Sequence, residues 1–265
     1  SILSDTNLFE RYLTSKQILI VTNEKVAPLY LSIIEKHVGE LDYETYILPD
    51  GESFKSLEYF NNVISKLIEK KFSRTCTLIA LGGGVVGDLA GFVAATFLRG
   101  IEVVQVPTSL TAMVDSSIGG KTGVDLPAAK NMVGAFHHPS MVITDVAALK
   151  TLSHRAFLEG WAEAIKHGLA FDADLVEMYD EHAEKLLALD PVVTTRAVAW
   201  NAATVSTAAG TKPWRVLPTD ERRSLRGPPV PASSRAPRRR PRRSLRRLAA
   251  WRRTPSAVVS RRIIS

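Results

Sequence analysis

Residues 76–99 read CTLIALGGGVVGDLAGFVAATFLR, and this stretch decides the fold. Its first seven residues are almost all apolar, which is typical of a buried strand. The glycines Gly82, Gly83 and Gly84 follow, and an apolar helical stretch begins directly after them. Glycines at such a junction let the backbone approach a ligand, and the new helix N-terminus presents free N–H groups to a phosphate. The junction therefore predicts a dinucleotide-binding turn or, alternatively, a tight turn that only packs the helix on the sheet.

Four further strands are expected around this unit, at residues 17–23, 43–49, 101–107 and 141–145. Helical periodicity separates several of them along the chain. Strands that alternate with helices and are apolar along their whole length indicate a parallel sheet with helices on both faces. We therefore predict an α/β domain over residues 1–145.

The character of the sequence changes near residue 146, where strand patterns end and helical periodicity begins. Phe157, Trp161, Ile165 and Leu169 recur every four residues, and apolar residues continue at helical spacing beyond them. Such a period places the apolar side chains on one face of a helix. We expect a partial all-helical domain over residues 146–212.

Residues 213–265 differ in composition from the rest of the chain. They hold 16 of the 34 lysines and arginines, all of them arginine, and only two acidic residues. The net charge of +7 comes from this segment, and the mildly acidic remainder argues against a nucleic-acid-binding function for the whole chain. A basic segment interrupted by eight prolines cannot bury enough apolar surface to offset its ordering entropy, so we expect a disordered tail.

Composition also bears on the cellular compartment. The single cysteine, Cys76, excludes an internal disulfide and a cysteine-based zinc cluster, and it suits a reducing compartment. The first residues lack the pattern of a signal peptide, and no apolar run is long enough for a membrane span. We expect a cytoplasmic protein without membrane association.

Hydroxyl side chains follow the strand at 101–107. Thr108 and Ser109 stand where ligands bind at the carboxyl edge of a parallel sheet, although either residue could equally cap a helix. Arg99 ends the preceding helix, where it could simply neutralise the helix C-terminus.

A second glycine-rich stretch lies at residues 119–122, GGKT. It is like the end of a nucleotide-binding P-loop, but Asp115 stands where the first glycine should be, which excludes a nucleotide triphosphatase. Glycines beside Lys121 still predict an anion-binding loop. Lys130 and Asn131 follow nine residues later and add a second cation and an amide.

Charged residues share one face of the expected helix at 159–168, EGWAEAIKHG. Glu163 and Lys166 are three residues apart, and Glu163 and His167 are four apart, as in a pair of metal ligands. Surface salt bridges are the default interpretation of such pairs.

Taken in order, these motifs resemble the 3-dehydroquinate synthase family. The matching runs are LGGGVVGDLAGFVAATFLRG, QVPTSLTAMVDSSIGGKTGVD, KNMVGAF, ALKTL and WAEAIKHG. The resemblance implies a Rossmann-like N-terminal domain, a helical C-terminal domain, and a homodimer that uses NAD and a divalent metal, zinc or cobalt. The implied reaction converts 3-deoxy-arabino-heptulosonate 7-phosphate, a sugar phosphate, to 3-dehydroquinate and phosphate.

The resemblance also implies site residues at matching positions. One set would line the NAD site: Asn23, Glu52, Lys55, Gly83, Gly84, Val85, Asp88, Thr108, Ser109, Lys130 and Thr151. A second set would contact the substrate: Arg99, Asp115, Lys121, Asn131 and Lys166. Arg99 would serve the partner subunit, Glu163 would be a metal ligand, and His167 would stay outside the site.

The sequence departs from the family after residue 182. Two histidine-containing segments that complete the family's metal site have no counterpart, because no histidine follows His182. One carboxylate cannot hold a catalytic zinc ion, which normally has three protein ligands. We expect an incomplete metal site and an inactive or impaired chain, with residues 213–265 produced by a frameshift or a mis-assigned gene end.

Three alternative functions stay open at this stage. The chain could be a related sugar-phosphate cyclase or a related NAD- and metal-dependent alcohol dehydrogenase. VDSSIGGKTGVD and KNMVGAF favour 3-dehydroquinate synthase over both. The third alternative is a nucleic-acid or interaction protein that acts through its basic tail, which is poor in the aromatic residues that stack on bases.

Overall fold

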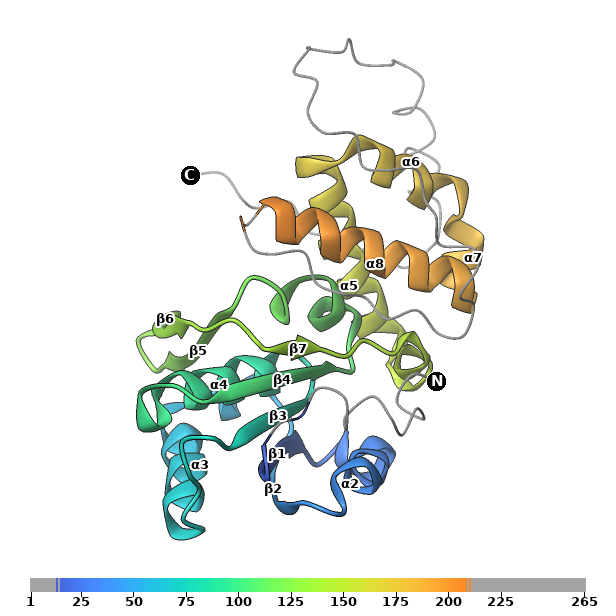
Figure 1. Ribbon diagram of the computed structural model, residues 1–265. Helices are drawn as coiled ribbons and strands as arrows, with labels where there is room; N and C mark the ends of the chain where they lie inside the picture. Colours follow the sequence, from blue (N-terminus) through green and yellow to red (C-terminus); the bar gives the residue numbers. More distant parts are fainter. Residues whose placement is uncertain (1–12, 14, 209, 211–265) are drawn as a thin grey trace. The chain divides into compact units, whose positions relative to one another are not determined.

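The computed structural model describes residue 13, residues 15–208 and residue 210 (Figure 1). The chain divides into two units, Ser1–Glu221 and Arg222–Ser265, and every described residue belongs to the first. The predicted tail at residues 213–265 lies outside the described residues. The predicted boundary between residues 145 and 146 stays a prediction.

The predicted parallel sheet is confirmed. Its five strands are all parallel and run in the order β2-β1-β3-β4-β7. Their bounds are β1 Gln17–Asn23, β2 Asp42–Leu48, β3 Thr77–Gly82, β4 Glu102–Pro107 and β7 Met141–Val142. The last strand is shorter than the predicted 141–145, because it pairs with β4 only at Val104 and Gln105.

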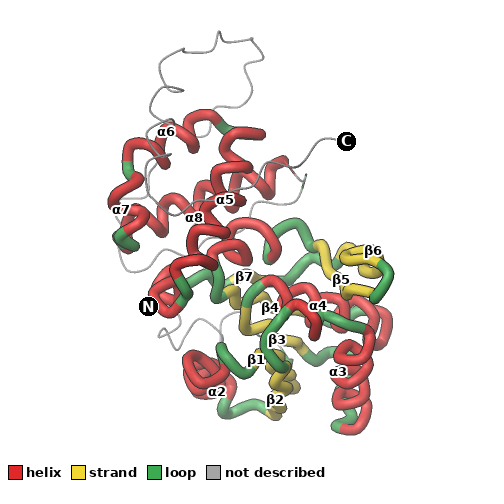
Figure 2. Tube along the Cα trace, turned by 180° about the vertical axis from the view of Figure 1, so that it is seen from behind, coloured by secondary structure: helices red, strands yellow, loops and turns green. Residues whose placement is uncertain are grey.

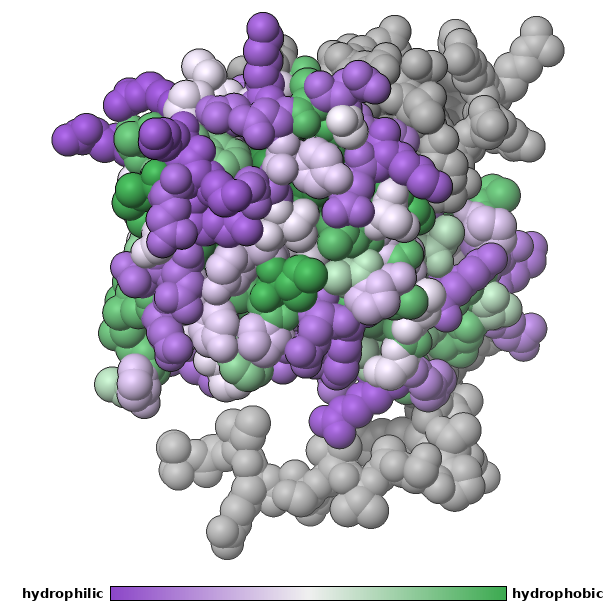
Figure 3. All heavy atoms as spheres, turned by 90° about the horizontal axis from the view of Figure 1, so that it is seen from below, coloured by the Kyte–Doolittle hydropathy of each residue, from purple (hydrophilic) through white to green (hydrophobic). Residues whose placement is uncertain are grey.

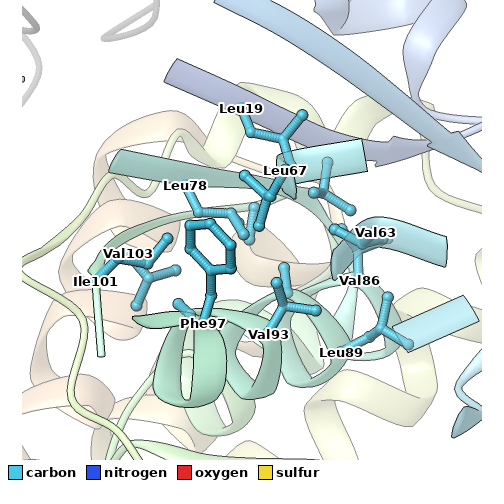
Figure 4. Packing of buried hydrophobic residues seen from close by; sticks show 14 of the residues in the cluster. Leu19, Val63, Leu67, Leu78, Val86, Leu89, Val93, Phe97, Ile101 and Val103 are labelled. Carbon is cyan, nitrogen blue, oxygen red and sulfur yellow. The ribbon is translucent and has the colours of Figure 1, made fainter. Parts of the chain in front are cut away.

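Helices cover both faces of this sheet (Figures 1 and 2). Alternate residues of β1 and β3 point to opposite faces, as the pleat requires. Leu19 and Leu78 pack with α3 and α4, whereas Ile18 and Ile79 pack with α2. The bounds are α2 Ser32–Val38, α3 Leu57–Glu69 and α4 Gly84–Thr96. Figure 4 shows the first face, where Val63, Leu67, Leu89 and Val93 close over the strands.

An antiparallel hairpin follows β4, where the sequence predicted only an anion-binding loop. Its strands are β5 Lys121–Leu126 and β6 Ala129–Phe136. Gly123 lies opposite Gly134, and a Cβ on Gly134 would come within 2.0 Å of the Thr122 carbonyl oxygen. The prediction of a loop was wrong because glycine has a weak strand preference, and this pairing depends on close packing across the two strands.

Short helical turns connect these elements. They are the π-helices η2 Ala27–Leu31 and η5 Ala112–Ser116 and the 3-10 helices η3 Glu52–Phe54, η4 Phe97–Arg99 and η6 Val146–Thr151. Beyond η6 the described chain is helical, as predicted: α5 His154–Phe171, α6 Ala173–Glu181, α7 Ala183–Leu187 and α8 Pro191–Ala208.

Side-chain caps begin two of these helices, and a hydrogen bond and a close glycine contact hold them against their neighbours. Ser153 caps α5 by accepting from the Ala156 amide, and Asp172 caps α6 by accepting from the Leu175 amide. The second oxygen of Asp172 accepts from Trp200 Nε1 at 2.8 Å, which ties α6 to α8. A Cβ on Gly160 would lie 2.5 Å from Leu110 Cβ, so α5 packs directly on the segment that follows β4.

The surface of the described part carries scattered apolar side chains among polar ones. In the view of Figure 3, hydrophilic residues occupy much of the face and hydrophobic residues form separate groups between them. None of the helices that the structure describes combines the length and the apolar character needed to cross a membrane.

Candidate functional site

A cavity of about 550 Å³ lies between the start of α4, η5 and the hairpin. Four residues that the resemblance assigned to the site line it: Asp88, Asp115, Lys121 and Asn131. The remaining lining residues are Ser116, Ile118, Thr122, Gly123, Met132, Gly134, Ala135 and Phe136. The cavity therefore offers one cation, two carboxylates and an amide beside apolar surface, which suits a polar small molecule with an anionic group.

The glycine-rich turn lies at the carboxyl edge of the sheet, as predicted. β3 ends at Gly82, and Gly83 precedes α4 without a side-chain cap. A Cβ on Gly83 would lie 3.3 Å from Ser109 Oγ, and a Cβ on Gly84 would lie 3.1 Å from Ser116 Oγ. The turn and the segment after β4 are thus packed closely, and the first-turn N–H groups of α4 stay available to an anion.

The segment after β4 is held against this turn by its backbone. The Thr108 amide donates to the Gly82 carbonyl at 2.9 Å. The Ser109 hydroxyl accepts from the Ala112 amide at 3.4 Å, so it also makes the local bond expected of a capping residue. Gly83, Gly84, Thr108 and Ser109 are therefore brought together, and Val85 follows them in the first turn of α4.

Lys55 is the buried cation of the site, with 5% of its side chain exposed. Its Nζ lies 2.6 Å from Asp88 Oδ2 and 2.6 Å from Asn131 Oδ1. The Lys55 carbonyl also accepts from the Asp125 amide at 2.7 Å. One side chain thus joins the segment after η3, the helix α4 and the hairpin.

The ion pair between Lys55 and Asp88 lies in a partly desolvated place. Burial raises the pKa of Asp88 above the ordinary aspartate value, although the Lys55 ammonium acts in the opposite direction. The energetic cost of removing water from the Asp88 carboxylate exceeds its attraction to the Lys55 ammonium. An ionised Asp88 without Lys55 would therefore destabilise the folded chain.

The other residues assigned to the NAD site make contacts of their own. Glu52 and Lys130 form an exposed pair at 3.7 Å. Asn23 donates to Asp50 Oδ1 at 3.0 Å and accepts from the Val26 amide. The Thr151 hydroxyl lies 2.7 Å from the Tyr30 hydroxyl. Their roles toward a cofactor stay predictions.

Arg99 stands at an unusual backbone position. It has a φ of 70° and follows Leu98, whose φ is 50°, so η4 ends in two consecutive left-handed residues. Its role toward a partner subunit stays a prediction.

A second group of polar residues lies on α5. Glu163 and Lys166 form an ion pair, as the default interpretation expected. His167 is different, because it is only 4% exposed and its Nε2 lies 3.5 Å from Asp115 Oδ1. Donor atoms of Asp115, Glu163 and His167 all lie within 4.8 Å of one another.

The prediction that His167 takes no part in the site stays a prediction, although the structure places this residue beside Asp115. The four-residue spacing from Glu163 was the available signal, but Asp115 comes from η5 and could not be paired with α5 from the sequence. The three residues supply one imidazole nitrogen and two carboxylate oxygens. This donor set fits a divalent transition metal such as zinc or cobalt.

Comparisons with known proteins find relatives of this chain. Residues 45–159 match the family described as 3-dehydroquinate synthase, N-terminal. The chain is 47% identical over 197 residues to the 3-dehydroquinate synthase of Hydrogenovibrio crunogenus, and 47% identical over 199 residues to that of Shewanella frigidimarina. These alignments cover 74% and 75% of this chain but 55% and 56% of the relatives. The chain thus spans about half the length of the curated relatives it matches.

Solved structures of related enzymes also match. A 2-epi-5-epi-valiolone synthase from Streptomyces hygroscopicus, with NAD⁺ and Zn²⁺ bound, superposes with a TM-score of 0.69 at 27% identity. The match covers 78% of this chain and 58% of that one. A 2-deoxy-scyllo-inosose synthase complexed with carbaglucose-6-phosphate, NAD⁺ and Co²⁺ gives a TM-score of 0.57 at 28% identity, covering 61% and 46%.

Proposed function

This chain belongs to the 3-dehydroquinate synthase family, and from that premise we propose that its described part binds NAD⁺ and a sugar phosphate. The supporting observation is the cavity that Asp88, Asp115, Lys121 and Asn131 line beside the glycine-rich turn. Both solved relatives were determined with NAD⁺ and a divalent metal, Zn²⁺ in one and Co²⁺ in the other.

The reaction that we propose for the complete enzyme of this family is the conversion of 3-deoxy-arabino-heptulosonate 7-phosphate to 3-dehydroquinate and phosphate. NAD⁺, when bound, supplies a hydride acceptor for a ring hydroxyl. The first-turn N–H groups of α4 would bind the pyrophosphate of the dinucleotide, with Gly83 and Gly84 allowing the close approach. Thr108 and Ser109 would contact the same cofactor from the segment after β4.

The cavity would hold the sugar phosphate. Lys121 lines it and would bind the phosphate group as a point charge. Asn131, which lies in β6 where the pairing with β5 is irregular and has a φ of 59°, would bind a hydroxyl while its amide oxygen accepts from Lys55. Lys166, which is exposed, would leave Glu163 to contact the substrate when Glu163 binds a cation.

The catalytic activity of this chain is a separate proposal. The two histidine-containing segments expected from the resemblance have no counterpart among these residues. We therefore expect NAD⁺ binding without measurable turnover. The expectations of a homodimer and of a cytoplasmic location also rest on the resemblance and composition, and sedimentation analysis of the purified chain tests the first.

Two measurements on the purified chain test the proposal. Isothermal titration with NAD⁺ should show saturable binding, and the variant Gly84→Val should weaken it, because a side chain there meets Ser116. A phosphate-release assay with the heptulosonate phosphate should show no turnover above background. Absence of NAD⁺ binding contradicts the first part, and metal-dependent phosphate release contradicts the second.

A related sugar-phosphate cyclase is the second candidate. The TM-score of 0.69 with the valiolone synthase supports it, whereas the 47% identity to curated 3-dehydroquinate synthases favours the first candidate. Incubating the chain with each sugar phosphate and analysing the products separates the two.

A further inference from the structure

We propose that Asp125 is a positioning residue for the cavity, because it holds Asn131 so that the Asn131 amide offers only N–H groups to a ligand. The inference rests on the proposed function, since the ligand considered is the sugar phosphate. It concerns a residue that neither the motifs nor the resemblance assigned to the site. Asp125 is not among the residues that line the cavity, so its effect on a ligand is exerted through Asn131.

Asn131 lies at an irregular place in the hairpin. Val124 of β5 pairs with Val133 of β6. Two residues further along β5, Leu126 pairs with Ala129, which lies four residues before Val133. Asn131 is therefore part of a bulge in β6, where its φ is 59°. Bulges re-aim side chains and are frequent beside active sites, and Asn131 lines the cavity from this one.

Three hydrogen bonds form a closed ring around this bulge. The Asp125 amide donates to the Lys55 carbonyl at 2.7 Å, and Asp125 Oδ1 accepts from the Asn131 amide at 2.8 Å. Lys55 Nζ donates to Asn131 Oδ1 at 2.6 Å. Asp125 also pairs with Ser56 in an isolated parallel bridge, which ties it to the segment of Lys55. The ring thus holds both the backbone and the side chain of Asn131.

The Asp125 carboxylate is placed for this contact. A carboxylate that accepts from a backbone N–H makes a charge-assisted hydrogen bond, which is stronger than a neutral one. Its other oxygen, Oδ2, is buried and has no hydrogen-bond partner among the residues that the structure describes. A buried oxygen without a partner is unfavourable, and the bond from Oδ1 to the left-handed Asn131 explains why the side chain is kept there.

The orientation of the Asn131 amide follows from Lys55. An ammonium group can only donate, so the amide oxygen must be the atom that faces Lys55 Nζ. The nitrogen Nδ2 is then the end of the amide left for a ligand, and it carries two N–H donors. A bound sugar phosphate must therefore present an acceptor oxygen to Asn131. Lys121 favours the same choice in this cavity, because it also can only donate.

Isothermal titration of the purified full chain with 3-deoxy-arabino-heptulosonate 7-phosphate, in the presence of NAD⁺, tests the inference. Asp125→Ala and Asn131→Ala should each weaken binding about tenfold, which corresponds to the loss of roughly one hydrogen bond. Asp125→Asn retains an acceptor oxygen and should bind nearly as the parent does. Glu40→Ala removes an exposed carboxylate elsewhere and should leave the affinity unchanged.

Two further variants separate positioning from a purely structural role. Asp125→Ala/Asn131→Ala should bind no more weakly than Asn131→Ala, because Asp125 acts through Asn131. A further loss in the double variant would show that Asp125 only stabilises the hairpin, and it would overturn the inference. Asn131→Asp keeps an oxygen toward Lys55 but replaces the two donors with an acceptor. It should weaken binding more than Asn131→Ala does, and equal or tighter binding contradicts the assigned orientation.

Hydrogen exchange in the ligand-free chain covers the case in which a variant fails to fold. The Asn131 backbone N–H should be protected in the parent and in Asp125→Asn, and it should exchange at least about tenfold faster in Asp125→Ala. An unprotected N–H in the parent overturns the inference. If the parent binds no sugar phosphate, the proposed function is contradicted, and the exchange rates still decide whether Asp125 holds Asn131.

Discussion

The buried pair between Lys55 and Asp88 allows a sharp test of how the site is held together. Lys55→Met removes the ammonium and keeps much of the side-chain volume. It leaves Asp88 as a desolvated carboxylate without its partner, and breaking a buried pair in this way costs about 3–5 kcal/mol. Asp88 is 22% exposed and can take up a proton, so we expect the lower end, about 3 kcal/mol.

Urea denaturation followed by circular dichroism measures this loss in the free energy of unfolding. Lys130→Met is the matched control, because Lys130 is 69% exposed and lies 3.7 Å from Glu52. An exposed pair of this kind contributes at most about 1 kcal/mol. The double variant Lys55→Met/Asp88→Asn should recover at least about 1 kcal/mol relative to the sum of the single losses, because the two residues are in contact.

The stability loss caused by Lys55→Met should depend on pH in one direction. Burial raises the pKa of Asp88 in the folded chain, and removing Lys55 takes away the effect that lowers it. A carboxyl group with a raised pKa binds its proton more tightly when folded, so its contribution is full below the unfolded value and is lost as the pH rises through the folded value. The loss in Lys55→Met should therefore be smaller at about pH 5 than at about pH 8. A loss below about 0.5 kcal/mol, or one that Lys130→Met equals, would refute the reasoning.

Three further predictions concern the core and the helical part. Gly160→Ala should destabilise the chain by about 1–3 kcal/mol, because its Cβ would lie 2.5 Å from Leu110 Cβ; an unchanged midpoint in thermal denaturation would contradict this packing. Burial raises the pKa of Cys76 to about 11, so alkylation by iodoacetamide at about pH 8 should be roughly a hundredfold slower than in the urea-unfolded chain; equal rates in both would show that the thiol is accessible. Trp200→Phe should lower the free energy of unfolding by about 1 kcal/mol, because the Asp172 oxygen that accepts from Nε1 loses a donor. The double variant with Asp172→Asn should lose less than the sum of the two single losses, because the two side chains are in contact.

Several parts of this protein were predictable because their determinants lie close together in the sequence. The apolar run that ends at Gly82 and the glycines after it sufficed to predict β3, its turn and α4. Period-four apolar residues from Phe157 onward sufficed for α5. The motifs around Asp115, Lys121 and Asn131 predicted an anion-binding segment, and the structure places all three in one cavity.

Other parts were decided only when distant segments packed together. The hairpin of β5 and β6 depends on the close approach of Gly123 to Gly134 and of Thr122 to Gly91 in α4, which no local pattern reveals. Lys55 meets Asn131 across 76 residues, and His167 meets Asn201 across 34. Strand and helix preferences act over a few neighbouring residues, whereas a shared proton, an ion pair or a metal site depends on distances of a few ångströms in space. The arrangement of the site therefore follows from the packing of α4 and the hairpin around the segment after β4.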